Sequence, residues 1–157
     1  IDYSSFAVFA EATTSNNTVL FPFKRGAFQG MRTVTPCYVE FECGMVKPFY
    51  DTVDFLPLVV LLFSQLSVSK STLFIMPDFT PNTIMLEKHA DKGTEPWEIF
   101  AWSVRDAISK ISGLPKENNN TLKDKYAYID FMNGYKDYME VNGRMFRIGG
   151  TYDSKTF

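Results

Sequence analysis

A carboxylate, several hydroxyls and two cations gather in one short stretch near the start of the chain. Glu11 is followed by the hydroxyl-rich residues 13–18, and Lys24 and Arg25 come a few positions later. Carboxylates and hydroxyls hydrogen bond to polyols, and a lysine beside a guanidinium favours phosphate oxygens. The stretch therefore indicates a site for a polyhydroxylated phosphate ligand. The alternative is an ordinary solvated turn before a cationic helix start.

The neighbouring residues predict the elements that position this stretch. Residues 5–10 are mostly apolar and predict a buried strand that ends at Glu11, and a short helix is predicted from Lys24 onward. Ligands of open α/β sheets gather at the carboxyl ends of parallel strands. We therefore expect Glu11, Lys24 and Arg25 to form one cluster at the end of a parallel strand.

Strands and helices alternate along the rest of the chain, which predicts an α/β fold. Two strands are predicted from β-branched and aromatic residues, and three helices from apolar runs and periodicity. These strands cover residues 34–41 and 71–76, and these helices cover residues 54–66, 96–112 and 126–138.

The clearest helix pattern covers residues 96–112. Its apolar residues recur every three or four positions, so one face is expected to pack inward. Thr94 is the expected N-cap and Pro96 suits the first turn. Gly113 and Pro115 are expected to end the helix.

Composition limits the classes of function. The 157 residues are 45% hydrophobic and 22% charged, which is typical of a folded chain of one domain. Because the net charge is -2, the chain lacks the basic excess that nucleic-acid binding needs. Two cysteines and one histidine are too few for a structural zinc site, and we expect Cys37 and Cys43 to be core residues. The longest apolar run, residues 55–63, is too short to span a bilayer.

Two segments resemble motifs of the glycerolipid acyltransferases. Residues 9–16 (Phe-Ala-Glu-Ala-Thr-Thr-Ser-Asn) and residues 20–28 are similar to the third motif, above all in the lysophosphatidylcholine acyltransferase branch. Residues 34–38 (Val-Thr-Pro-Cys-Tyr) are similar to the fourth motif. The resemblance extends from residue 6 to about residue 115. It implies acyl transfer from acyl-coenzyme A to a hydroxyl of a lysophospholipid or glycerol phosphate at a membrane surface, with no metal or redox cofactor.

The resemblance also implies roles for single residues. Glu11 matches the carboxylate that holds the acceptor head group, and Thr13 and Thr14 follow it in the motif. Lys24 and Arg25 match a basic pair that offers charge to the phosphate. These five residues are the predicted substrate-binding set, and Pro36 matches the fourth-motif proline on the acyl-chain side.

The chain departs from the family pattern in three ways. Thr14 stands where many members have an arginine, although the lysophosphatidylcholine acyltransferase branch often has threonine or cysteine there. Ala10 replaces a proline, and Ala12 replaces a glycine that uses positive φ. The family's general base, a histidine with an aspartate five positions later, is absent, because the single histidine, His89, is followed at that distance by Thr94. We expect His89 to lie in a charged, solvated loop and predict no catalytic residue in this chain.

The resemblance implies a glycerol-3-phosphate acyltransferase-like mixed sheet flanked by helices and incomplete at its N-terminus. Residues 1–115 would form the C-terminal half of that domain, and residues 116–157 a polar linker and extension. Two functions follow. The chain is part of an acyltransferase whose other half supplies the base, or it is a degenerate structural subunit of a larger membrane assembly, such as one in the mitochondrial inner membrane. The endoplasmic reticulum and a mitochondrial membrane are the two expected locations.

The predicted strands and helices are too few to cover both faces of a parallel sheet. We therefore expect several apolar residues to be covered by lipid, by the other half of the domain or by partner subunits. These residues are Phe6, Val8, Phe21, Phe23, Phe28 and residues 55–63.

Overall fold

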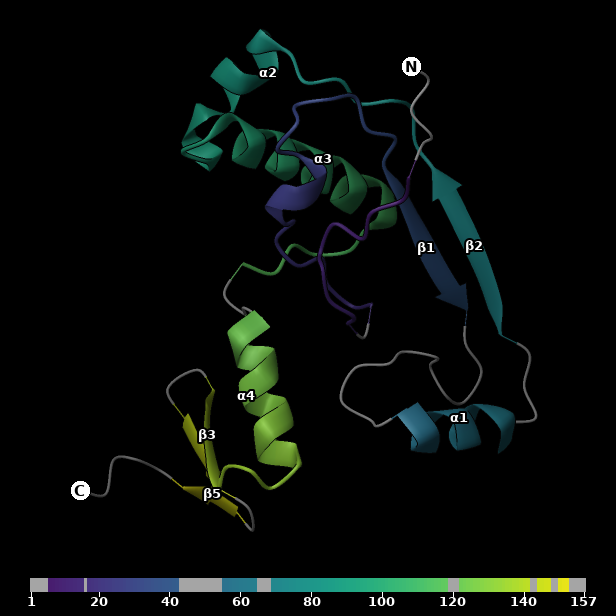
Figure 1. The fold of residues 1–157 in the computed structure, drawn as a ribbon, viewed down its shortest axis with the longest axis vertical. Coiled ribbons are helices and arrows are strands. Elements are labelled where there is room, and N and C mark those ends of the chain that lie inside the picture. The colour runs from purple at the N-terminus through teal and green to yellow at the C-terminus, as the bar shows by residue number, and fades with distance from the viewer. Residues whose placement is uncertain are drawn as a thin grey trace. The chain divides into compact units, whose positions relative to one another are not determined.

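The computed structural model describes residues 6–15, 17–42, 55–64, 69–118, 122–141, 144–147 and 150–152. The chain divides into two compact units, Ile1–Asn118 and Asn119–Phe157. Within the described residues the protein is mixed α/β, with four α-helices and two small antiparallel sheets (Figure 1).

Helix α3 (Pro96–Ser112) is the central element of the first unit and confirms the predicted bounds. Its N-cap is Glu95 and not Thr94, because Glu95 and Glu98 form a reciprocal capping box. The Thr94 backbone N–H instead donates to Glu98 Oε2 at 2.7 Å. Gly113 ends the helix at φ 73°, a conformation that glycine adopts without steric cost.

The core of the first unit forms on one face of α3. Phe100 is fully buried there, and Phe28 and Phe79 lie against its ring at centroid distances of 5.4 and 6.1 Å. The buried cluster consists of Leu20, Phe28, Phe100, Ala101, Val104 and Ile108. The predicted inward face is thus confirmed at its centre, whereas Ile111, near the C-terminal end of α3, is 56% exposed. Phe28 is only 2% exposed, so the prediction that lipid or another protein segment covers it is wrong.

Strands β1 (Cys37–Glu42) and β2 (Lys70–Ile75) form one antiparallel pair, visible as two adjacent arrows in Figure 1. The register runs from Cys37 opposite Ile75 to Glu42 opposite Lys70. Both predicted strands are confirmed. The expected core position of Cys37 is wrong, because this residue is exposed, and Cys43 lies outside the described residues.

The predicted buried strand over residues 5–10 is wrong for residues 6–10, which form no strand. Phe6 and Phe9 are 85% and 91% exposed. A strand needs a neighbour that accepts its ladder hydrogen bonds, and both sheets in the described part of the chain are antiparallel and built from other residues. Glu11 therefore does not follow a parallel strand.

Three short helical elements and one longer helix complete the first unit. The helix predicted from Lys24 is confirmed as a single 3₁₀ turn, η1 (Arg25–Ala27). Helix α1 (Phe55–Ser64) confirms the predicted apolar helix. His89 does not lie in a solvated loop: it is half-buried between helix α2 (Thr83–Lys88) and the 3₁₀ turn η2 (Ala90–Lys92).

The second unit contains helix α4 (Leu122–Met132) and a sheet of β3 (Tyr138–Val141), β4 (Arg144–Arg147) and β5 (Gly150–Tyr152). The strands pair antiparallel in the order β3-β4-β5. The helix ends earlier than predicted, because Gly134 turns the backbone at φ 75° and its N–H donates to the Phe131 carbonyl.

No helix among the described residues has the length and apolar character needed to cross a bilayer.

Candidate functional site

The backbone brings Glu11 close to the start of η1. The Lys24 N–H donates to the Ala10 carbonyl at 2.7 Å, so the two ends of the hydroxyl-rich loop meet. The Glu11 carboxylate points inward, where its Oε1 accepts the Phe21 N–H at 3.0 Å. Glu11 therefore holds the loop that carries it.

Arg105 of α3 lies beneath this loop and was missed by the sequence analysis. It is only 4% exposed. Its guanidinium donates to the Leu20 carbonyl at 2.5 Å, to the Glu117 carbonyl, and to Asn118 Oδ1 at 2.8 Å. Its Nε has no hydrogen-bond partner among the described residues. Arg105 thus joins the loop to the segment that follows α3.

Backbone hydrogen bonds strengthen the same junction. The Leu20 N–H donates to the Pro115 carbonyl at 2.9 Å, and the Glu117 N–H donates to the Leu20 carbonyl at 2.9 Å. Lys116, predicted as the first residue of a polar linker, therefore forms an isolated parallel bridge with Leu20.

The electrostatics of the junction follow from burial. Burial raises the pKa of the Glu11 carboxyl above its ordinary value of 4.5, while the Phe21 N–H and the Arg105 charge act in the opposite direction. Burial also lowers the pKa of the Arg105 guanidinium, while the charges of Glu11 and Glu117 act to raise it. Arg105 stays protonated, so it supplies a permanent cation beside Glu11.

The other predicted substrate-binding residues lie nearer the surface. Thr13 is half-buried, and its hydroxyl donates to the Thr14 carbonyl at 3.3 Å. Thr14, Lys24 and Arg25 are exposed. The structure brings the Lys24 backbone next to Ala10, whereas Oε1 of Glu11 accepts the Phe21 N–H.

Ala12, which aligns with a glycine of the motif that the sequence resembles, has a positive φ. Its φ is 53°, and its N–H closes a turn onto the Phe9 carbonyl at 3.0 Å. An alanine in this left-handed region costs about 1 kcal/mol relative to glycine. The loop therefore retains a strained position directly after Glu11.

Pro36 is buried, and its carbonyl accepts the Met76 N–H at 2.9 Å. This hydrogen bond continues the contact between β1 and β2 beyond their ends. Pro36 thus has a structural position at the base of the strand pair.

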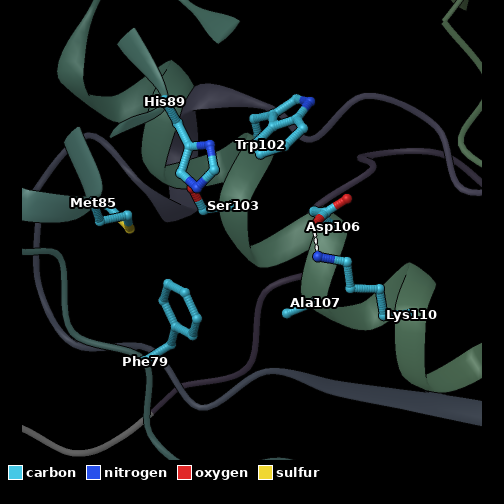
Figure 2. Close-up of a pocket in the computed structure, with 8 residues that line it drawn as sticks. All are labelled: Phe79, Met85, His89, Trp102, Ser103, Asp106, Ala107 and Lys110. Atoms are coloured by element: carbon cyan, nitrogen blue, oxygen red, sulfur yellow. Dashed lines mark ion pairs between the residues drawn. The ribbon is translucent and has the colours of Figure 1, made fainter. Parts of the chain in front are cut away.

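A second candidate site is a cavity of about 220 Å³ between α2, α3 and the segment around Phe79 (Figure 2). Its lining includes aromatic, apolar and charged side chains: Phe79, Met85, His89, Trp102, Ser103, Asp106, Ala107 and Lys110. The His89 and Trp102 rings lie 5.1 Å apart between centroids, with a tilt of 42°.

Among the described residues that line this cavity, Asp106 is the only carboxylate, and two lysines bind it. Lys110 Nζ lies 2.7 Å from Asp106 Oδ2, and Lys116 Nζ donates to Oδ1. Burial acts to raise the pKa of Asp106, but the hydrogen bonds from both lysines outweigh it and hold the pKa below its ordinary value. Lys116 and Lys92 also lie over the Trp102 ring, with Nζ 5.0 and 5.6 Å from its centroid.

Sequence reasoning missed this cavity because its residues come from separate elements. The sequence did contain a sign that Arg105 is buried. Arg105 lies four positions after Ala101 and three before Ile108, within the apolar stripe of α3. No comparable spacing joins His89 to Trp102, because their contact depends on how α2 packs on α3.

Within the described residues, no group of three or more His, Cys, Asp or Glu side chains is placed to hold a metal ion. Comparison of the chain with protein-family models, with curated proteins and with solved structures finds no match.

Proposed function

We propose that this chain is an acyltransferase-like structural subunit, in which the third-motif residues stabilise a loop and do not act on a substrate. The observation that carries the proposal is the position of the Glu11 carboxylate. Its Oε1 accepts the Phe21 N–H and the carboxylate lies near the buried Arg105, so this group contributes to the fold. The absence of the family's histidine and aspartate base from the sequence supports the same function.

Apolar side chains on α1 support a place in a membrane-associated assembly. Helix α1 carries no charged residue, and most of its side chains are exposed. The large apolar ones among them are Phe55 (68%), Leu56 (71%), Val60 (60%), Leu61 (44%) and Phe63 (87%). Large exposed apolar patches mark contacts with a membrane or with a protein partner. A lipid surface or neighbouring subunits of an endoplasmic reticulum or mitochondrial membrane assembly would cover them.

The second candidate function is acyl transfer from acyl-coenzyme A to a lysophospholipid or glycerol phosphate, with the base supplied by a segment outside this sequence. Two observations favour it. Ala12 keeps the positive φ of the family's glycine, and Lys24 and Arg25 are exposed where a phosphate could reach them. Under this function Glu11, Thr13, Thr14, Lys24 and Arg25 bind the acceptor, and no metal or redox cofactor takes part.

One experiment separates the two functions. Release of coenzyme A from acyl-coenzyme A is measured with the chain in its full-length natural form, across a panel of lysophospholipids and glycerol phosphate. The structural function predicts release no faster than without protein. Release that is lost in a Lys24→Gln/Arg25→Gln double variant establishes the enzyme instead.

A stability measurement provides the matched control. Glu11→Ala leaves the Phe21 N–H without its acceptor, so we expect the free energy of unfolding to fall by about 1 kcal/mol. Lys24→Ala keeps the backbone N–H that closes the loop onto the Ala10 carbonyl and removes only an exposed side chain, so it should change the free energy of unfolding by less than about 0.5 kcal/mol. Equal effects of the two substitutions would contradict a structural role for Glu11.

A further inference from the structure

The cavity between α2 and α3 is separate from the loop at Glu11, and part of its lining is held by hydrogen bonds. Phe79 is fixed by two backbone hydrogen bonds with Val34, of 2.7 and 3.1 Å, and its ring stacks on Phe100. The Met85 N–H donates to the Asn82 side chain at 2.8 Å, which caps α2. These hydrogen bonds fix the backbone at Phe79 and Met85, and the stacking on Phe100 fixes the Phe79 ring, so this part of the binding site is formed before a ligand arrives.

Aromatic and apolar groups line this open cavity together with polar ones. In Figure 2 the His89 and Phe79 rings point toward the cavity from opposite sides, with Met85 beside them and Ala107 on the α3 side. The Trp102 ring lies beside the His89 ring, with 5.1 Å between their centroids. The volume of about 220 Å³ is below the range of roughly 300 to 1,000 Å³ for drug-sized ligands, so the cavity suits a molecule with a single ring.

Two lysines bind the one carboxylate among the described residues of the cavity lining, so the group carries one net positive charge. Asp106 is bound by both Lys110 and Lys116, and the Lys116 side chain is the better enclosed of the two, at 28% exposure against 75% for Lys110. Lys110 can therefore leave Asp106 and pair with an incoming anion while Lys116 keeps the carboxylate neutralised. A single surplus positive charge matches a single carboxylate.

We propose that this cavity binds a small aromatic carboxylate, whose ring lies between Phe79 and His89 and whose carboxylate pairs with Lys110. This site is independent of the proposed structural function, because it uses none of the residues of the loop at Glu11. Lys110 supplies a charge-assisted hydrogen bond, and the surrounding rings supply stacking and apolar contact.

Benzoate is the probe, and benzamide is its neutral counterpart of the same shape. Binding to the full chain is followed by NMR through the indole N–H signals of its two tryptophans. Trp102 lines the cavity and Trp97 does not, so Trp97 serves as an internal reference. We expect benzoate to shift the Trp102 signal saturably, with a dissociation constant on the order of 1 mM, and benzamide to bind at least about fivefold more weakly.

Three variants test the geometry. Lys110→Gln should weaken benzoate binding about fivefold, because the charge-assisted hydrogen bond becomes a neutral one. Lys88→Gln removes an exposed lysine of α2 that does not line the cavity, so it should bind like the natural chain. Ala107→Leu places a larger side chain in the cavity and should abolish binding.

The proposal is overturned if benzoate gives no saturable shift at Trp102, if benzamide binds equally well, or if Lys110→Gln binds as tightly as Lys88→Gln. Circular dichroism establishes that each variant is folded. If Ala107→Leu does not fold, the Lys110 variant and the benzamide comparison decide the outcome, since Lys110 is exposed and its replacement leaves the core intact.

Discussion

Helices α1 and α3 show that apolar character alone does not place a helix in the core. Helix α1 has no charged residue, yet Leu58 is its only buried side chain. Helix α3 contains both acidic and basic residues, and seven of its side chains are buried. The difference lies in periodicity and in partners. In α3 the apolar residues share one face, and Leu20, Phe28 and Phe79 are present to cover it.

The largest expected effect separates the two helices directly. Phe100→Ala in α3 removes a fully buried ring and leaves a cavity, so the free energy of unfolding should fall by about 4 kcal/mol. Phe63→Ala in α1 removes a ring that is 87% exposed and should change it by less than about 0.5 kcal/mol. Urea unfolding of both variants measures the contrast. A similar loss in the two helices would show that α1 is buried in the isolated chain.

A second prediction concerns the polar contacts of α3. Arg105→Ala removes the donor to the Leu20 and Glu117 carbonyls and leaves Glu11 without its neighbouring cation. We expect a loss of about 3 kcal/mol in the free energy of unfolding. Arg32→Ala, at an exposed position, is the matched control and should lie within about 0.5 kcal/mol of the natural chain. If Arg105→Ala lowers the free energy of unfolding no more than Arg32→Ala does, the loop is held by its backbone hydrogen bonds alone.

A third prediction is a substitution that increases the free energy of unfolding. Ala12→Gly should raise the free energy of unfolding by about 0.5 to 1 kcal/mol, because φ 53° strains alanine and suits glycine. Ala27→Gly in η1, which is not at positive φ, should lower it by roughly 0.5 to 1 kcal/mol. Thermal melting of both variants tests the pair, and destabilisation by Ala12→Gly would mean that position 12 is not strained.

The smallest effect concerns the pH dependence of stability. Because burial raises the pKa of Glu11 in the folded state, its contribution to stability is fully present below its ordinary pKa of 4.5 and is lost as pH rises through the raised value. Glu11→Gln keeps an acceptor for Phe21 but does not ionise. The natural chain should therefore lose stability relative to Glu11→Gln as pH rises from 4.5. A relative gain would mean that the attraction to Arg105 outweighs the cost of burial.

The elements that the sequence predicted well are those whose signals are local. Helix α3 begins and ends as its periodicity, Pro96 and Gly113 indicate, and strands β1 and β2 follow their β-branched and aromatic residues. The resemblance marked Ala12 as a position where similar sequences have a glycine, and the φ of Ala12 is 53°.

The failures have a common physical cause, which is dependence on distant partners. Residues 6–10 have the composition of a strand, but no described strand lies beside them to complete a ladder. Arg105 lies within an apolar stripe because two carbonyls outside α3 accept its hydrogen bonds, that of Leu20, 85 positions away, and that of Glu117, 12 positions away. The environment of His89 is likewise set by Trp102 on another helix.

The junction between Leu20 and the segment after α3 also affects the order of folding. Its hydrogen bond from Arg105 joins residues 85 positions apart, so forming it closes a long loop. The loop-closure entropy opposes this step by about 4 kcal/mol plus a constant, whereas α3 forms through neighbouring residues. Long-range contacts of this kind slow folding. Helix α3 should therefore be present first, and the amide hydrogen of Leu20 should gain protection from exchange only when the first unit is nearly complete.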